Sequence, residues 1–331
     1  MALNWIAGGS GSGKTEYLYK KIIEMSLAEP DARFFILVPE QATMQAQKEI
    51  VRLHPRHGTM NIDIVSFDRL AYRIFSELSI PQPEILDDMG KTMVLRKLAG
   101  EKKKELLLFS SHLNRPGFIA GVKSMLSELY QYGVSPEALK EQANREGVSR
   151  ILSAKLSDME VLFRAFQEFT KERYITSEEL LDVLCRVADR SKLLKGCVLA
   201  LDGYTGFTPV QYRLLGLLMG MCRELYVTVT ATDPALLSGA GKETDLFDMS
   251  RTMVSKLGEL AVRRGIEIRT EAAFLKRPLI RFQNRPALDE LERGFFRYPY
   301  RPYHGDDGSI RLVQAETPAA EGGFAVNGIL Q

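Results

Sequence analysis

Gly8-Gly9-Ser10-Gly11-Ser12-Gly13-Lys14-Thr15, near the start of the chain, has the spacing G-x-x-x-x-G-K-T of a phosphate-binding loop, or P-loop. Its glycines allow the backbone to curl so that successive N–H groups point at a phosphate. Lys14 supplies a positive charge to the β- and γ-phosphates, and the Thr15 hydroxyl is placed to bind Mg²⁺. We therefore predict that these eight residues bind a nucleoside triphosphate.

The residues on both sides of this loop predict a strand before it and a helix after it. Asn4–Ala7 is a short apolar run typical of a buried strand. From Glu16 onward, apolar side chains recur at helical spacing, at Tyr17, Leu18, Ile22, Ile23 and Met25. A bound anion would therefore meet a helix N-terminus, where free N–H groups and the helix dipole favour negative charge. The alternative is an ordinary Gly/Ser loop without a ligand.

Strands and helices continue to alternate up to about residue 85. We expect strands at Arg33–Val38 and Asn61–Val65, and helices at Gln41–Leu53 and at Phe67–Leu78 behind an N-cap at Ser66. The first of these strands is a continuous β-branched and aromatic run that ends at Pro39, as buried parallel strands do. The alternation predicts an α/β fold with a parallel sheet.

The pattern changes between residues 86 and 195. Long amphipathic stretches, Lys91–Leu98, Gly117–Tyr130 and Ala154–Arg173, follow one another without a convincing strand. We therefore predict that an inserted all-helical domain interrupts the core. The charge run Lys102-Lys103-Lys104 is interpreted as a solvated face, because it lacks the interleaved aromatic side chains of a nucleic-acid site.

Strand patterns return at Cys197–Leu201 and Leu225–Ala231, followed by a helix near Asp245–Arg264 and a strand at Ile266–Arg269. Beyond a stretch of prolines and aromatics we expect a strand at Ile310–Ala315 and a helix that opens at Thr317-Pro318. The predicted domains are 1–85, the first part of the P-loop core; 86–195, the helical insertion; 196–292, the second part of the core; and 293–331, a linker and the start of a truncated second core.

Composition excludes several classes of protein. The 44 Lys and Arg nearly balance the 42 Asp and Glu, so nucleic-acid contacts would depend on local patches. There is no N-terminal signal pattern and no run of about 18 apolar residues, so we expect a cytoplasmic protein without membrane contact. Cys185, Cys197 and Cys222 lack C-x-x-C spacing and predict neither a disulfide framework nor a zinc or iron–sulfur site.

Asp202, at the end of the Cys197–Leu201 strand, is the candidate for a second magnesium ligand. P-loop NTPases hold Mg²⁺ through the Thr or Ser of the loop and a carboxylate at the tip of a neighbouring strand, so we predict Thr15 and Asp202 as the metal-binding pair. An Asp-Gly turn without a metal is the alternative. The next residue is Gly203, where a carboxylate usually positions the attacking water. Loss of such a group lowers the rate by about 10²–10⁴, which predicts ATP binding with weak or no hydrolysis.

Several stretches resemble one family. Asp202–Gln211 is similar to the D-E-x-Q-D-x-x-P-x-Q motif of superfamily 1 helicases, with the Glu and the first Gln lost. Val38–Thr43 and Val65–Arg73 are similar to the L-V-P-E-Q-A-T and S-F-x-R-L-A-x-R segments of AddB, the second subunit of the AddAB helicase–nuclease. Phe295–Pro299 and Ile310–Glu316 also resemble that family. The chain is thus identified as similar to an AddB N-terminal region over essentially its whole length.

The resemblance implies a RecA-like P-loop domain in a subunit that works with an AddA motor subunit on single-stranded and duplex DNA ends, in double-strand-break repair by recombination. It also implies recognition of the Chi sequence. The family's RecB-like nuclease, with its metal, and its iron–sulfur cluster belong to a C-terminal region outside this chain. The arginine that speeds hydrolysis in such enzymes comes from a second RecA-like domain, of which only the start is expected here.

Loops after the core strands open on the side of the nucleotide crevice, and the family analogy places single-stranded DNA there. The candidate DNA-binding residues are Gln41, Thr43, Ser66, Phe67 and Arg69. Phe67 either stacks on a base or packs in the core. Arg293–Tyr303 mixes arginines with aromatics, but its prolines favour a linker. Two other functions stay open: a structural scaffold with a relict P-loop and, less favoured because Asp202 is so far from Lys14 in sequence, a small-molecule kinase.

Overall fold

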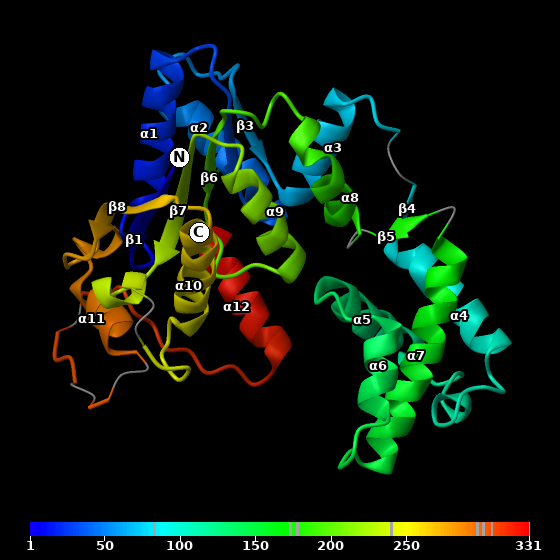
Figure 1. Cartoon of the computed structure of the whole chain (residues 1–331). Coiled ribbons are helices and arrows are strands. Elements are labelled where there is room, and N and C mark those ends of the chain that lie inside the picture. The colour runs from blue at the N-terminus through cyan, green and yellow to red at the C-terminus, as the bar shows by residue number, and fades with distance from the viewer. Residues whose placement is uncertain are drawn as a thin grey trace.

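The centre of the molecule is a parallel sheet of six strands in the order β3-β2-β6-β7-β1-β8 (Figure 1). This computed structural model describes residues 1–81, 84–171, 174–176, 179–238, 241–295, 298–299, 302–305 and 307–330. The strands are β1 (Ala2–Gly8), β2 (Phe34–Leu37), β3 (Ile62–Val65), β6 (Val198–Leu201), β7 (Glu224–Thr230) and β8 (Glu267–Phe274). The predicted α/β fold with a parallel sheet is confirmed.

Helices cover both faces of this sheet. On one face lie α1 (Lys14–Ala28) and α2 (Thr43–Leu53), and on the other lie α3 (Phe67–Glu77), α8 (Leu180–Val187), α9 (Pro209–Met219) and α10 (Asp248–Arg263). Successive strand side chains point to opposite faces, so Phe34 and Ile36 pack toward α1 whereas Phe35 and Leu37 pack toward α3. Burial on both faces explains why the β2 sequence is apolar without alternation.

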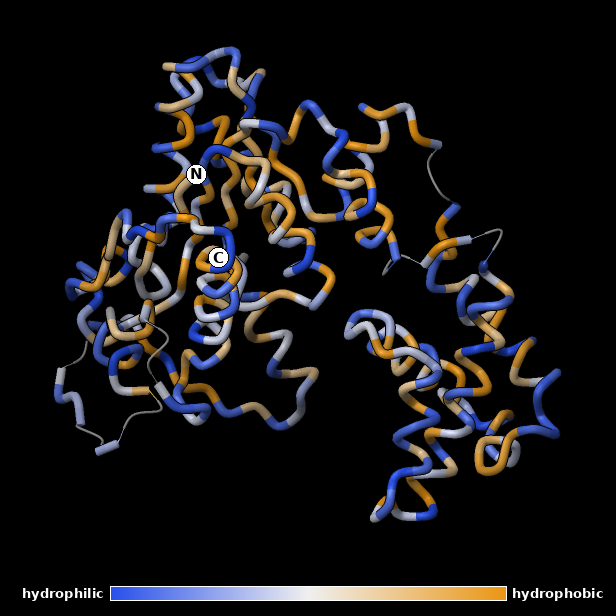
Figure 2. Tube along the Cα trace, viewed as in Figure 1, coloured by the Kyte–Doolittle hydropathy of each residue, from blue (hydrophilic) through white to orange (hydrophobic). Residues whose placement is uncertain are grey.

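A second group of helices forms a lobe beside the sheet: α4 (Asp88–Glu101), α5 (Phe118–Gln131), α6 (Pro136–Ala143) and α7 (Arg150–Thr170) (Figure 1). Leu95, Leu126, Phe163 and Phe166 are buried in its own apolar core. Apolar residues run through both regions of the molecule (Figure 2). The lobe is therefore a separate packing unit.

Two short strands, β4 (Ile85–Leu86) and β5 (Ile175–Thr176), pair where the chain enters and leaves the lobe. The sequence predicted no strand between residues 86 and 195, because two residues are too few to show a period. Leu180 and Leu184 of α8 pack with the sheet, and the last residue in contact with the lobe's core is Tyr174. The division at residue 195 stays a prediction, and the packing groups α8 with the sheet.

After β8 the chain forms a short 3₁₀ turn, η5 (Ile280–Phe282), then α11 (Pro286–Gly294) and α12 (Pro318–Leu330). The predicted strand at Ile310–Ala315 is wrong, since none is present there in the described structure. A strand needs a neighbour to share its backbone hydrogen bonds, and none lies beside this segment among those residues. Phe296, Arg297 and Arg301, parts of the predicted family resemblance and aromatic stretch, lie outside the described residues.

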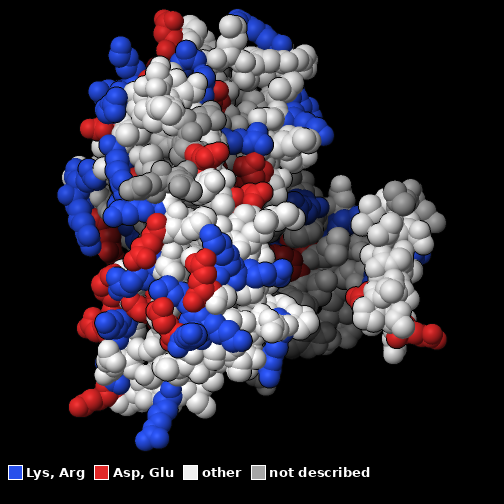
Figure 3. Space-filling view, turned by 90° about the vertical axis from the view of Figure 1, so that its right-hand side faces the viewer, with Lys and Arg blue, Asp and Glu red and all other residues white. Residues whose placement is uncertain are grey.

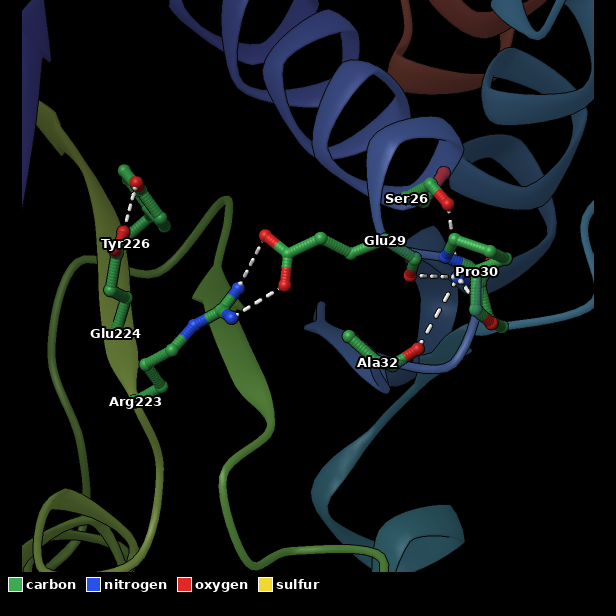
Figure 4. Close-up of polar contacts among 8 residues, drawn as sticks. Ser26, Glu29, Pro30, Ala32, Arg223, Glu224 and Tyr226 are labelled. Carbon is green, nitrogen blue, oxygen red and sulfur yellow. Dashed lines mark hydrogen bonds and ion pairs between the residues drawn. The ribbon is translucent and has the colours of Figure 1, made fainter.

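Polar contacts tie the amino ends of the strands together (Figure 4). Arg223, just before β7, donates two hydrogen bonds to Glu29 after α1, at 2.6 and 3.1 Å. The side-chain amide of Asn61 lies within 3.2–3.4 Å of the carbonyl oxygens of Ser26, Glu29, Pro30 and Ala32. These contacts link the segments that precede the strands, at the end of the sheet opposite the P-loop.

Candidate nucleotide site

The P-loop joins the end of β1 at Gly8 to the start of α1 at Lys14. Gly11 and Gly13 have φ values of 88° and 90°, in the left-handed region that strains other residues. Gly13 is also the N-cap of α1 and offers no side-chain acceptor, so the first N–H groups of the helix stay available to an anion. The strand–loop–helix context expected from the sequence is therefore present.

A pocket of about 540 Å³ opens beside this loop. Gly11, Gly13, Lys14 and Thr15 line one side of it, whereas Gly8, Gly9, Ser10 and Ser12 do not reach it. The other walls come from α2, from Asp202 with Gly203, and from Ile280 with Arg281. The fold thus gathers residues from four distant parts of the chain around one cavity.

Asp202 is buried at the end of β6 and accepts three hydrogen bonds. Thr15 Oγ1 donates to its Oδ1 over 3.1 Å and Thr228 Oγ1 to the same oxygen over 2.7 Å, while the Tyr19 hydroxyl donates to Oδ2 over 3.1 Å. Burial and the neighbouring Asp202 raise the pKa of Tyr19, which keeps its hydroxyl protonated as a donor. A hydroxyl and a carboxylate side by side are the oxygen ligands that Mg²⁺ prefers, so this pair fits the metal.

The Lys14 ammonium reaches back across the loop and donates to the carbonyl of Gly9 over 3.2 Å. Burial lowers the pKa of Lys14; Asp202 opposes this effect and Arg281 adds to it. Two positive side chains therefore line one pocket, and the Asp202 carboxylate beside them is shared among three hydroxyl donors. A bound phosphate would relieve that imbalance.

Residues after β8 lie directly over the P-loop. The backbone N–H of Arg281 donates to the Gly11 carbonyl over 3.1 Å. A Cβ at Gly11 would lie 2.8 Å from the Cβ of Arg281, and one at Gly13 would lie 2.9 Å from Ile280. Close approach and positive φ thus both require glycine at these positions. Arg277 holds the segment in place through ion pairs with Asp289, at 3.1 Å, and with Glu292.

No carboxylate stands at the position after Asp202. Gly203 has a φ of 78°, and its N–H donates to Thr228 Oγ1 over 3.3 Å. Two other carboxylates line the pocket, but Glu16 pairs with Lys20 and Glu49 pairs with Arg52. The site therefore has groups that fit phosphate and metal, and Asp202, its buried carboxylate, accepts hydrogen bonds from three hydroxyls.

Comparison with known proteins places the chain in a family. The model of the family "ADDB, N-terminal" matches residues 5–292. The chain belongs to the AddB N-terminal family. Proteins named as the B subunit of an ATP-dependent helicase/deoxyribonuclease are similar to it: that of Lachnoclostridium phytofermentans is 40% identical over 98% of this chain and 29% of the relative, and that of Desulforudis audaxviator is 34% identical over 100% and 28%. The chain thus spans less than a third of the length of these relatives.

The five candidate DNA-binding residues of this AddB-family chain differ in exposure. Phe67 is buried and meets Tyr204 and Phe207 edge-on, as a core residue does. Buried Ser66 caps α3 by accepting the Arg69 N–H over 3.3 Å, and buried Thr43 donates to the Glu40 carbonyl over 2.7 Å. Gln41 and Arg69 are exposed, and Arg69 pairs with Glu40 at 3.0 Å. Of the five, only Gln41 and Arg69 can meet DNA without rearrangement.

Sequence reasoning missed three residues of the site. Tyr19 is four residues after Thr15, so the spacing of one helix face was a usable signal. Thr228 is a polar residue within the buried strand β7, which also was a signal, because buried polar groups need partners. Arg281 had none: it reaches the P-loop only through the tertiary fold.

No helix in the described part of the chain is both long and apolar enough to cross a bilayer. The same residues contain no cluster of three or more His, Cys, Asp or Glu side chains arranged to hold a metal ion.

Proposed function

We propose that this chain binds a nucleoside triphosphate with Mg²⁺ at the P-loop pocket, as the helicase-like N-terminal region of a DNA-end-resecting helicase–nuclease subunit. The observation that carries the proposal is the 3.1 Å contact between Thr15 and Asp202, which are 187 residues apart in sequence, beside Lys14 and the open N-terminus of α1. The relatives' name, with its words "ATP-dependent", supports ATP as the nucleotide.

The residues divide into phosphate and metal ligands. Lys14, the N–H groups at the start of α1 and the guanidinium of Arg281 are placed to hold the phosphates. Thr15 and Asp202 would hold Mg²⁺, which neutralises phosphate charge when bound. Gly203 brings no carboxylate to orient water, and loss of such a group lowers the rate by about 10²–10⁴. The proposed site binds ATP and hydrolyses it slowly or not at all.

Within the longer protein, this region would guide single-stranded DNA from a DNA end. Gln41 and Arg69 support that role, because both are exposed after the carboxyl ends of β2 and β3, on the side of the sheet that carries the P-loop. The relatives are named as one of at least two subunits, which supports an AddA-like partner, with double-strand-break repair in the cytoplasm as the setting. The nuclease and the iron–sulfur cluster would belong to the part of the relatives beyond this chain.

Titration with Mg·ATP tests the nucleotide site. We expect Lys14→Ala to weaken binding at least tenfold, because a charge-assisted contact to phosphate contributes about 1.5–3 kcal/mol. Lys48→Ala is the matched control, since Lys48 is exposed on α2 near the pocket and is absent from the pocket wall. Equal affinity of the two variants would exclude the proposed P-loop role.

The same titration separates the alternatives. A structural scaffold with a relict P-loop would bind no ATP in the unsubstituted chain. A small-molecule kinase would transfer phosphate to an acceptor at a rate that depends on that acceptor. Hydrolysis at tens per second would contradict slow turnover at a site with Gly203.

A further inference from the structure

The helical lobe contains a second pocket, of about 550 Å³, between α4 and the start of α5. Three positive side chains line it: Arg96 from α4, Lys103 from the turn that follows α4, and Arg115 from the loop before α5. No acidic residue lines this α4–α5 groove.

Among the described residues, no acidic side chain neutralises these three cations. Their neighbours Lys97, Lys102 and Lys123 pair with Glu101, Glu105 and Asp88. Arg96, Lys103 and Arg115 form no ion pair within the part of the chain that the structure describes. On the side of the molecule that carries the lobe, Lys and Arg lie interspersed with Asp and Glu (Figure 3). The groove therefore concentrates positive charge that the surrounding surface balances locally.

Small residues in the groove lining leave room for a ligand to come close to the backbone. Among them are Ala99, Gly100 and Ala120, and a Cβ at Gly100 or Gly117 would meet nothing within 4 Å. Gly117 is the N-cap of α5 and brings no side-chain acceptor, so N–H groups of its first turn add to the positive potential of the three cations. No aromatic side chain lines the groove to take a base.

The geometry points to a binding site for the phosphate backbone of DNA in the α4–α5 groove, separate from the P-loop. Three cations carried by three segments, α4, the turn after it and the loop before α5, match several phosphates of a strand better than a single ion. Without aromatic partners the contact is independent of sequence and sensitive to salt. The inference rests on the proposed function only in its choice of DNA as the anion, and it needs no nucleotide at the P-loop.

Fluorescence anisotropy with labelled single-stranded and duplex oligonucleotides of about 20 nucleotides tests this site. The groove variant is Arg96→Gln/Lys103→Gln/Arg115→Gln. The matched control, Lys97→Gln/Lys102→Gln/Lys140→Gln, removes the same charge from the lobe outside the groove. All three groove side chains belong to exposed residues, so circular dichroism and thermal melting should match the unsubstituted chain.

We expect the groove variant to bind at least tenfold more weakly at low salt than the control. Three lost phosphate contacts should also reduce the slope of log K against log[salt] by about 2–3, at roughly 0.7–0.9 per phosphate. Equal affinity and slope in the two triple variants would overturn the site, and so would an unsubstituted chain that binds no DNA.

Two further experiments distinguish DNA from free inorganic phosphate as the ligand, and the groove site from the proposed function. Calorimetric titration with inorganic phosphate should show no binding that depends on the groove; groove-dependent phosphate binding with unchanged DNA affinity would overturn the DNA assignment. If Arg69→Gln weakens DNA binding while the groove variant does not, the proposed function stands and the groove fails. If the groove variant no longer binds DNA while the unsubstituted chain binds no Mg·ATP, the groove site stands and the proposed nucleotide site fails.

Discussion

The strands of the central sheet begin at one side, here called the amino edge, and end at the opposite side, the carboxyl edge. The polar groups at these two edges have different partners. At the amino edge, Glu29 and Arg223 satisfy each other and the Asn61 amide meets backbone carbonyls, so little is left for a ligand. At the carboxyl edge, Lys14 and Arg281 line an open pocket together with one buried carboxylate, Asp202. The comparison teaches that polar groups at one edge pair with each other, whereas Lys14 and Arg281 at the other edge face an open pocket, which supports the proposed phosphate site.

Substitution of Asp202 should have the largest effect on stability, because Asp202 both accepts buried hydrogen bonds and contacts Thr15 of the P-loop. Asp202→Ala leaves the buried Thr228 and Tyr19 hydroxyls without their acceptor, and we expect it to lower the free energy of unfolding by about 2–3 kcal/mol. Asp202→Asn keeps an acceptor oxygen and should recover most of that loss. Urea denaturation measures both variants.

The two variants Asp202→Ala and Asp202→Asn together separate the effect of Asp202 on stability from its effect on metal binding. Both variants lose the carboxylate, so Mg²⁺ should no longer increase their affinity for ATP. If Asp202→Asn keeps a full magnesium effect, Asp202 is a structural residue and the carboxyl edge resembles the amino edge more than we propose.

Gly203→Glu should have a smaller effect and tests the proposal that the missing carboxylate limits ATP hydrolysis. A residue with a Cβ is strained at a φ of 78°, so we expect a loss of about 1–2 kcal/mol in urea denaturation. We expect ATP hydrolysis to stay slow, because an added carboxylate does not supply the arginine that such enzymes take from a second RecA-like domain. Gly206→Glu, in the same loop with no neighbour within 4 Å of its Cβ, is the control for added charge. Fast hydrolysis in Gly203→Glu alone would show that the missing side chain was the whole defect.

Local patterns made much of the fold and part of the site predictable. The parallel sheet follows from apolar runs such as β2, and Lys14 and Thr15 follow from loop spacing; the predicted neighbours Thr15 and Asp202 lie 3.1 Å apart. The strand at Ile310–Ala315 failed because an apolar pattern does not reveal whether a partner strand lies beside it.

Residues that act together only through the tertiary fold could not be predicted from local patterns. Arg281 gives no sign in the sequence that it lies over Gly11. The charge run at Lys102-Lys103-Lys104 was interpreted as one solvated face, yet Lys102 pairs with Glu105 while Lys103 joins Arg96 in the groove. Phe67 shows the converse limit: its place at the start of a helix fitted both a base contact and the core, and only packing separates them.

The protonation of Lys14 gives a subtler test of the carboxyl edge. Burial first, and then Arg281, hold the pKa of Lys14 below the ordinary lysine value of 10.5, and bound phosphates would raise it. ATP binding should therefore take up protons in the alkaline range below pH 10.5, and affinity should fall as pH rises there. Calorimetry in two buffers of different ionisation enthalpy measures the uptake. Lys14→Arg, which stays charged, should show neither effect; equal uptake by it would contradict the role of Lys14.

The smallest effect is expected at the amino edge, from Glu29→Gln. The side chains of Glu29 and Arg223 are 44% and 41% exposed, and ion pairs in water contribute little because solvent and salt screen them. Arg223 lowers the pKa of Glu29, so whatever the pair contributes is present at neutral pH and is lost as pH falls through the lowered pKa. At neutral pH we expect a melting temperature close to that of the unsubstituted chain and unchanged affinity for ATP. A loss of stability as large as that of Asp202→Ala would show that the Glu29–Arg223 ion pair is not weakened by solvent. The difference between the two edges would then not be explained by burial.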